Sequence, residues 1–143
     1  MNEHNILGAI LAGEQSKRMG QDKLFLELNN RKLIEYTIDK VKKYLKNVII
    51  ITNQKNEFFL KKNLITVEDC IKGQLGPLVG ILTAMKWAKE NLKGCSWIAT
   101  FPCDTPFFPE TIIQKFIEKS KEKDSLLLCA SSHGRKHNIF GLW

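Results

Sequence analysis

The sequence predicts an α/β domain in which a mostly parallel sheet carries helices on both faces. Two observations support this prediction. Short apolar runs, such as ILGAIL at 6–11 and VIII at 48–51, are typical of strands that are buried on both faces. Segments with apolar residues at helical spacing separate these runs. Strands that alternate with helices form βαβ units and hence a parallel sheet with right-handed crossovers.

The length and composition indicate one globular domain. A chain of 143 residues can bury a single sizeable core, and no repeat, low-complexity tract or linker divides it. We therefore expect one domain over residues 1–143. The apolar runs are too short to span a bilayer, and the N-terminus lacks the pattern of a signal peptide. These features predict a cytoplasmic protein that does not bind membranes.

The net charge of +7 would suit a nucleic-acid binder, but the pattern of the lysines favours another explanation. The lysines spread over predicted helix faces without aromatic residues between them, as expected of solvated surfaces. We therefore expect no nucleic-acid partner. The cysteines form no CxxC pair, which favours reduced thiols over zinc ligands or disulfides: Cys70, Cys95, Cys103 and Cys129.

In the first half of the chain the pattern predicts a strand at 5–12, a short extended segment at 24–28 and a helix at 32–45. It then predicts a second strand at 48–52, a short helix at 54–62 and a third strand at 64–69. The extended segment ends at Asn29–Asn30, a turn signal. The longer helix has apolar residues at helical spacing with lysines between them.

The second half of the chain continues the alternation. The pattern predicts a loop at 70–77, a helix at 78–92, a fourth strand at 96–101, a helix at 109–122 and a fifth strand at 125–130. One apolar face of the first of these helices comprises Leu78, Leu82, Met85 and Ala88. The polar stretch SSHGRKHN predicts a loop. The final IFGLW predicts the beginning of a strand that is left unfinished, with unpaired edge groups and exposed aromatic surface.

Ligands of such folds bind beyond the carboxyl ends of the strands, and polar residues gather there in this chain. The loop over 13–23 follows the first strand, and its glycines and cations suit a polyphosphate. It matches neither the GxxxxGK[ST] nor the GxGxxG signature. Asn53, Asp69 and Asp104 follow the next three strands. Each also has a simpler interpretation, as the end of a strand or, for Asp104, as a turn or helix cap.

Five motifs in one order carry a more specific signal. They are LAGxxSxRMGxDK at 11–23, VIIITN at 48–53, VED at 67–69, GPLxG at 76–80 and PCDTPF at 102–107. Together they resemble the molybdenum cofactor guanylyltransferase family. The resemblance implies a Rossmann-like three-layer sandwich of the nucleotidyltransferase type. It also implies transfer of GMP from Mg-GTP to the terminal phosphate of molybdopterin that carries molybdenum, with release of pyrophosphate.

The resemblance also implies a set of site residues. The nucleotide would be bound by Leu11, Ala12, Gly13, Lys23, Asn53, Asp69 and Asp104. Of these, Lys23 and Asp104 would be catalytic, and Asp104 would hold Mg²⁺. The implied partners are GTP, the molybdenum cofactor, and enzymes that donate or accept that cofactor. The chemistry independently requires such groups, because a phosphate that attacks another phosphate needs a hard divalent cation and fixed cationic side chains.

Two departures from the family pattern leave alternatives open. Glu14 stands where the family has a glycine. A like-charge contact between Glu14 and the nucleotide phosphates at about 4 Å and an effective dielectric near 20 would cost on the order of 4 kcal/mol, falling to about 1 kcal/mol if the side chain reaches water. Activity therefore requires that Glu14 point outward. The sequence also stops before the C-terminal segment with which the family completes its domain. The alternatives are a catalytically silent GTP-binding remnant and a transferase that uses CTP or acts on a sugar phosphate.

Overall fold

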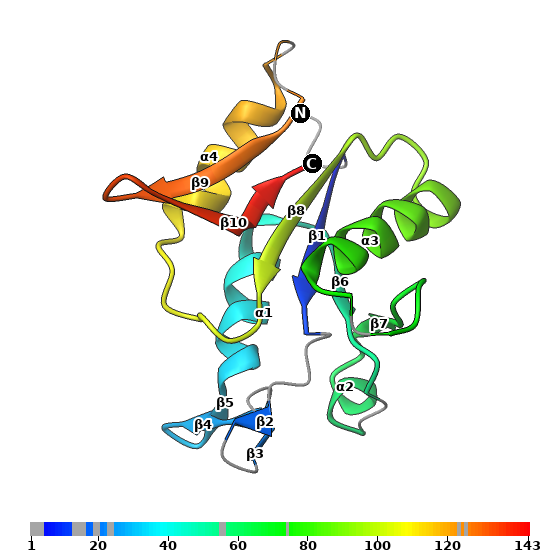
Figure 1. Ribbon diagram of the computed structural model, residues 1–143, viewed down its shortest axis with the longest axis vertical. Coiled ribbons are helices and arrows are strands. Elements are labelled where there is room, and N and C mark those ends of the chain that lie inside the picture. Colours follow the sequence, from blue (N-terminus) through cyan, green and yellow to red (C-terminus); the bar gives the residue numbers. More distant parts are fainter. Residues whose placement is uncertain are drawn as a thin grey trace.

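The computed structural model describes residues 5–12, 17–18, 21–22, 25–54, 57–73, 75–122, 124 and 126–143. Within these ranges a six-stranded sheet has the order β7-β6-β1-β8-β10-β9 (Figure 1). Its strands are β1 (Ile6–Leu11), β6 (Asn47–Ile51), β7 (Ile65–Val67), β8 (Trp97–Pro102), β9 (Leu128–Ser132) and β10 (Arg135–Leu142). The helices are α1 (Leu33–Tyr44), α2 (Glu57–Lys61), α3 (Pro77–Asn91) and α4 (Thr111–Ser120). Two small pairings join β2 (Lys17–Arg18) to β3 (Gln21–Asp22) and β4 (Glu27–Leu28) to β5 (Arg31–Lys32).

The predicted fold class is confirmed. Strands β7, β6, β1 and β8 run parallel, and β10 runs antiparallel to both of its neighbours. Helices cover both faces of this sheet, so the architecture is a three-layer sandwich (Figure 1). The turn predicted at Asn29–Asn30 is also present. Both residues have positive φ, 52° and 62°, and they connect β4 to β5.

The sheet divides the core into two clusters because its strand residues alternate between faces. On one face Ile6 and Ile10 of β1 pack with α1, α2 and α4. On the other face Leu7 and Ala9 pack with α3. β1 lies between β6 and β8 and has both faces covered, which explains its nearly continuous apolar sequence. None of the helices in the described ranges is both long and apolar enough to cross a membrane.

Gly8 lets α1 approach the centre of the sheet closely. A Cβ atom at this position would lie 2.9 Å from Val41 Cγ1 and 3.2 Å from Leu45 Cδ1. We expect Gly8→Ala to lower the free energy of unfolding by about 1–3 kcal/mol, because an extra methyl group strains a packed core. Chemical denaturation followed by circular dichroism measures this change. Stability equal to that of the wild type would show that α1 can shift without cost.

The polar stretch SSHGRKHN is mostly a β-hairpin, so the predicted loop was wrong. β9 ends at Ser132, the turn has positive φ at His133 (49°) and Gly134 (75°), and β10 begins at Arg135. Positive φ at both central residues is what a two-residue hairpin requires. The outer part of this hairpin is exposed on both faces. Its strands therefore lack the apolar alternation by which a strand is recognised.

The prediction of an unfinished edge strand at IFGLW was also wrong. β10 lies inside the sheet, between β8 and β9. Trp143 and Ile98 exchange two backbone hydrogen bonds of 2.9 and 3.0 Å, and the Trp143 indole N–H donates to Thr100 Oγ1 at 2.9 Å. Leu142 is fully buried. The strand predicted at 125–130 begins later, at Leu128.

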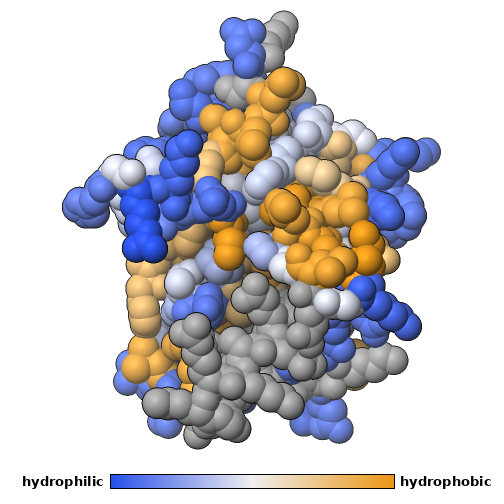
Figure 2. Space-filling model, viewed as in Figure 1, coloured by the Kyte–Doolittle hydropathy of each residue, from blue (hydrophilic) through white to orange (hydrophobic). Residues whose placement is uncertain are grey.

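The predicted apolar face of α3 does not face the core. Leu78, Leu82 and Met85 are exposed by 68%, 37% and 39%, although Ala88 is buried. The helix instead buries a face with small residues, formed by Val79, Gly80, Ile81, Thr83, Ala84 and Ala88. Small side chains let the helix axis lie close to the sheet, so the larger ones are left outside. Figure 2 shows the resulting apolar surface over α3.

Candidate functional site at the carboxyl edge of the sheet

Four parallel strands end at the same edge of the sheet. Three backbone hydrogen bonds join the residues at or just after the strand ends. Ala12 N donates to Ile51 O at 2.8 Å, Thr52 N to Val67 O at 3.0 Å and Cys103 N to Leu11 O at 3.3 Å. The segments that follow β1, β6, β7 and β8 therefore begin side by side. This is the edge at which the sequence predicted a ligand site.

The first predicted contact region begins where the chain leaves β1. Leu11 is partly buried and Ala12 is 6% exposed. The carbonyl group of Leu11 accepts a hydrogen bond from Cys103, just after β8, and the N–H group of Ala12 donates one to Ile51 of β6. These bonds fix the point from which the next loop departs. The predicted residues Gly13 and Lys23, as well as Glu14, lie outside the described residues.

Asn53 and Asp69 form a reciprocal pair beyond β6 and β7. Asn53 Nδ2 donates to Asp69 Oδ2 at 3.0 Å, and Asp69 N donates to Asn53 Oδ1 at 2.9 Å. The sequence placed both residues at this edge, and the structure shows that each fixes the orientation of the other. Asn53 is exposed and Asp69 is partly buried. The pair therefore presents a fixed amide and carboxylate next to the end of β1.

The start of α3 packs against this pair. A Cβ atom on Gly80 would lie 3.1 Å from Leu11 Cδ2 and 4.0 Å from Asp69 Oδ1, so the absence of a side chain permits this close approach. Asp69 Oδ1 is buried and accepts no hydrogen bond from any residue that the structure describes. Thr83 adds a contact that the sequence did not reveal, because its Oγ1 accepts from Cys70 N at 2.9 Å and donates to Val79 O at 2.7 Å. Thr83 thereby ties the residue after Asp69 to α3.

Asp104 lies two residues beyond the end of β8. Its side chain is exposed, and its carboxylate has no hydrogen-bond or ion-pair partner within the described part of the chain. That part also contains no group of three or more His, Cys, Asp or Glu residues that could hold a metal ion. A single exposed carboxylate suits Mg²⁺, because Mg²⁺ in phosphate sites keeps several waters and binds substrate phosphates.

Helix α1 contacts the loop that carries Asp104, a relation that the sequence did not reveal. Glu110, at the end of this loop, accepts hydrogen bonds from the Tyr44 hydroxyl at 2.6 Å and from Lys43 Nζ at 3.0 Å. These two bonds hold the pKa of the Glu110 carboxyl group below its usual value. Lys40, one turn earlier, contacts the loop as well. The only available signal was the spacing of these residues on one face of α1, and spacing does not identify a partner.

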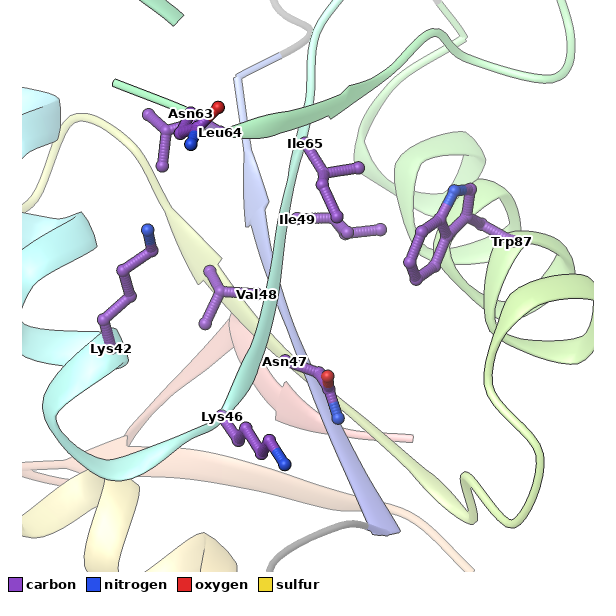
Figure 3. Close-up of a pocket in the computed structure, with 9 residues that line it drawn as sticks. All are labelled: Lys42, Lys46, Asn47, Val48, Ile49, Asn63, Leu64, Ile65 and Trp87. Atoms are coloured by element: carbon purple, nitrogen blue, oxygen red, sulfur yellow. The ribbon is translucent and has the colours of Figure 1, made fainter.

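A pocket of about 200 Å³ lies at the other end of the strands (Figure 3). It is lined by Lys42, Lys46, Asn47, Val48, Ile49, Asn63, Leu64, Ile65 and Trp87. Asn47 and Ile65 are the first residues of β6 and β7, so the pocket marks the amino ends of these strands. Figure 3 shows Lys42 and Trp87 on opposite sides of β6. Of the predicted site residues, none that the structure describes lines this pocket.

The parallel sheet and the polar residues at its carboxyl edge together define an α/β domain of the Rossmann-like class, in which ligands bind beyond the ends of the strands. Comparison with known proteins agrees with this class. The chain belongs to the family of the MobA-like NTP transferase domain, whose model matches residues 8–143.

Two relatives bear the name molybdenum cofactor guanylyltransferase. The protein from Rhizobium rhizogenes is 34% identical over 134 residues, which cover 94% of this chain and 61% of the relative. The protein from Mesorhizobium japonicum is 32% identical over 140 residues, which cover 97% and 67%. The chain thus spans about three fifths to two thirds of the length of these relatives.

A solved structure supports the fold. The molybdopterin-guanine dinucleotide biosynthesis protein A from Archaeoglobus fulgidus superposes with a TM-score of 0.70 at 18% identity. The match covers 96% of this chain and 66% of that protein. At this identity the likeness concerns the fold alone.

Proposed function

We propose that this chain transfers GMP from Mg-GTP to the phosphate of molybdopterin in the molybdenum cofactor, with release of pyrophosphate. The names of the 34% and 32% identical relatives support this choice of reaction. The observation that carries the proposal is the exposed carboxylate of Asp104, which lies on the same sheet edge as the Asn53–Asp69 pair.

In the proposed reaction the protein binds and orients, and it supplies little covalent chemistry. Asn53 and Asp69 contact the nucleotide toward its nucleoside end and fix its orientation. Asp104 holds Mg²⁺, which neutralises phosphate charge when it is bound. Lys23 contacts the phosphates, and the Leu11–Gly13 segment lines the nucleotide through backbone groups. The acceptor phosphate then attacks the α-phosphorus, and pyrophosphate leaves.

A coupled assay of pyrophosphate release tests the proposal. The protein is incubated with Mg²⁺, molybdopterin loaded with molybdate, and either GTP, CTP or ATP. We expect release with GTP that requires both the metal and the pterin. A preference for CTP would instead indicate a cytidylyltransferase.

Calorimetric titration with GTP and Mg²⁺ separates the other outcomes. Binding without turnover would indicate a silent nucleotide-binding module. The absence of both binding and turnover would overturn the proposal.

A further inference from the structure

Lys40 of α1 reaches across to the loop after β8. Its Nζ donates to Pro106 O at 2.5 Å and to Phe108 O at 2.8 Å. The same ammonium group lies 4.5 Å from the centroid of the Phe108 ring, within the range of a cation–π contact. Lys40 is partly buried, and this burial lowers the pKa of its ammonium group. A lysine that exchanges water for two carbonyl groups and a ring is not an ordinary surface cation.

The loop after β8, residues 103–110, is anchored on both sides of Asp104. Phe108 is 8% exposed, and its ring stacks on Phe101 at 5.6 Å and meets Phe140 edge to face at 5.1 Å. Glu110 is held by Tyr44 and Lys43 of α1. Before Asp104, Cys103 N is bonded to Leu11 O. Asp104 therefore lies between the end of β8 and the carbonyl groups under Lys40, and its own carboxylate has no hydrogen-bond or ion-pair partner among the described residues.

We propose that Lys40 is a positioning residue, which fixes the loop through the carbonyl groups of Pro106 and Phe108 and so sets the place of the Asp104 carboxylate. This inference rests on the proposed function for its catalytic consequence. It goes beyond that function by assigning a role to a residue of a different element, 66 residues away from Pro106 in sequence. Three residues on one face of α1, namely Lys40, Lys43 and Tyr44, then act on the same loop.

The test compares Lys40→Met with Lys42→Met. Methionine keeps the apolar stem of Lys40 over Phe108 and removes the N–H donors. Lys42 is an exposed lysine of the same helix and makes no hydrogen bond or ion pair with the described residues, so Lys42→Met is a matched control. Lys40→Arg keeps the charge and the donors and tests for rescue. Lys40→Gln replaces the methionine variant if that variant does not purify as a folded protein.

Two readouts do not depend on turnover. The first is the ¹⁵N relaxation order parameter of residues 104, 105, 107 and 108. In Lys40→Met we expect it to fall from about 0.85 to below about 0.6, the range of flexible backbone. The second is a Mn²⁺ titration in the presence of GTP, followed by paramagnetic broadening of the Asp104 amide signal. We expect the Kd for the metal to rise about 10-fold or more, as when residues that orient a metal ligand are lost.

The third readout is transfer itself. In Lys40→Met we expect kcat to fall about 10- to 100-fold with little change in the KM for GTP, and Lys40→Arg to recover much of the loss. Equal loop order and equal metal affinity in Lys40→Met and Lys42→Met would overturn the inference, as would a uniform loss of stability that Lys42→Met shares. An inactive wild-type protein would refute the proposed function alone, because the order parameters and the Mn²⁺ titration still decide the role of Lys40.

Discussion

Asp104→Ala is expected to reduce Mg²⁺-dependent transfer by about 10³-fold, because the proposed reaction assigns the metal beside the phosphates to this carboxylate. We expect this loss of activity to occur without a loss of stability. Asp104 is exposed and has no hydrogen-bond or ion-pair partner among the described residues, so its removal leaves no described buried group unsatisfied. The free energy of unfolding should therefore change by no more than about 0.5 kcal/mol. Steady-state kinetics over a range of Mg²⁺ concentrations measures the effect.

Asp124→Ala is the matched control for this variant. Asp124 is an exposed aspartate between α4 and β9, at the end of the sheet where β9 begins. We expect its replacement to leave both transfer and stability unchanged. Chelation of the metal should abolish transfer by the wild type and by Asp124→Ala alike. Turnover of Asp104→Ala near the wild-type level would show that another group holds the metal.

The sequence revealed part of the site because ligands of such folds bind beyond the carboxyl ends of the parallel strands. Apolar runs located the strands, and the parallel order placed Asn53, Asp69 and Asp104 at one edge before any distance was known. The structure adds the hydrogen bonds that join Asn53 to Asp69, which no sequence pattern specifies. Such contacts depend on the registers of β6 and β7, and register is a property of the assembled sheet.

The parts that the sequence missed depend on contacts between distant segments. In the sequence Lys40 looks like one of several lysines on a solvated helix face, and its contacts with Pro106 and Phe108 become visible only in the folded chain. The face of α3 was misassigned because small residues, and not the largest ones, determine how closely a helix can pack on a sheet. The C-terminal strand was misjudged because its partner, β8, precedes it by about 40 residues. The local amino-acid composition does not predict such pairings between distant segments.

Phe101→Ala is expected to cause the largest loss of stability, about 3–5 kcal/mol. Phe101 is fully buried on β8 and contacts the rings of Phe108, Phe116 and Phe140 at centroid distances of 5.6, 6.1 and 6.4 Å. Its removal leaves a cavity between β8, α4 and β10 that none of these elements can fill without moving. Domains of this size have a free energy of unfolding of about 5–15 kcal/mol, so the loss is a large fraction of the total.

Thermal and chemical denaturation of Phe101→Ala should show a fall in Tm of about 10–20 °C. Phe107→Ala is the control, because Phe107 belongs to the same loop as Phe108 but is 69% exposed, and its ring contacts Tyr36 at 6.2 Å. We expect it to change the free energy of unfolding by less than about 1 kcal/mol. The stack on Phe101 also supports Phe108, whose carbonyl group Lys40 holds. A Phe101→Ala protein studied well below its Tm should therefore also bind metal more weakly, which links the core beneath β8 to the placement of Asp104. Equal stabilities of the two alanine variants would show that the ring cluster is not the core that its burial indicates.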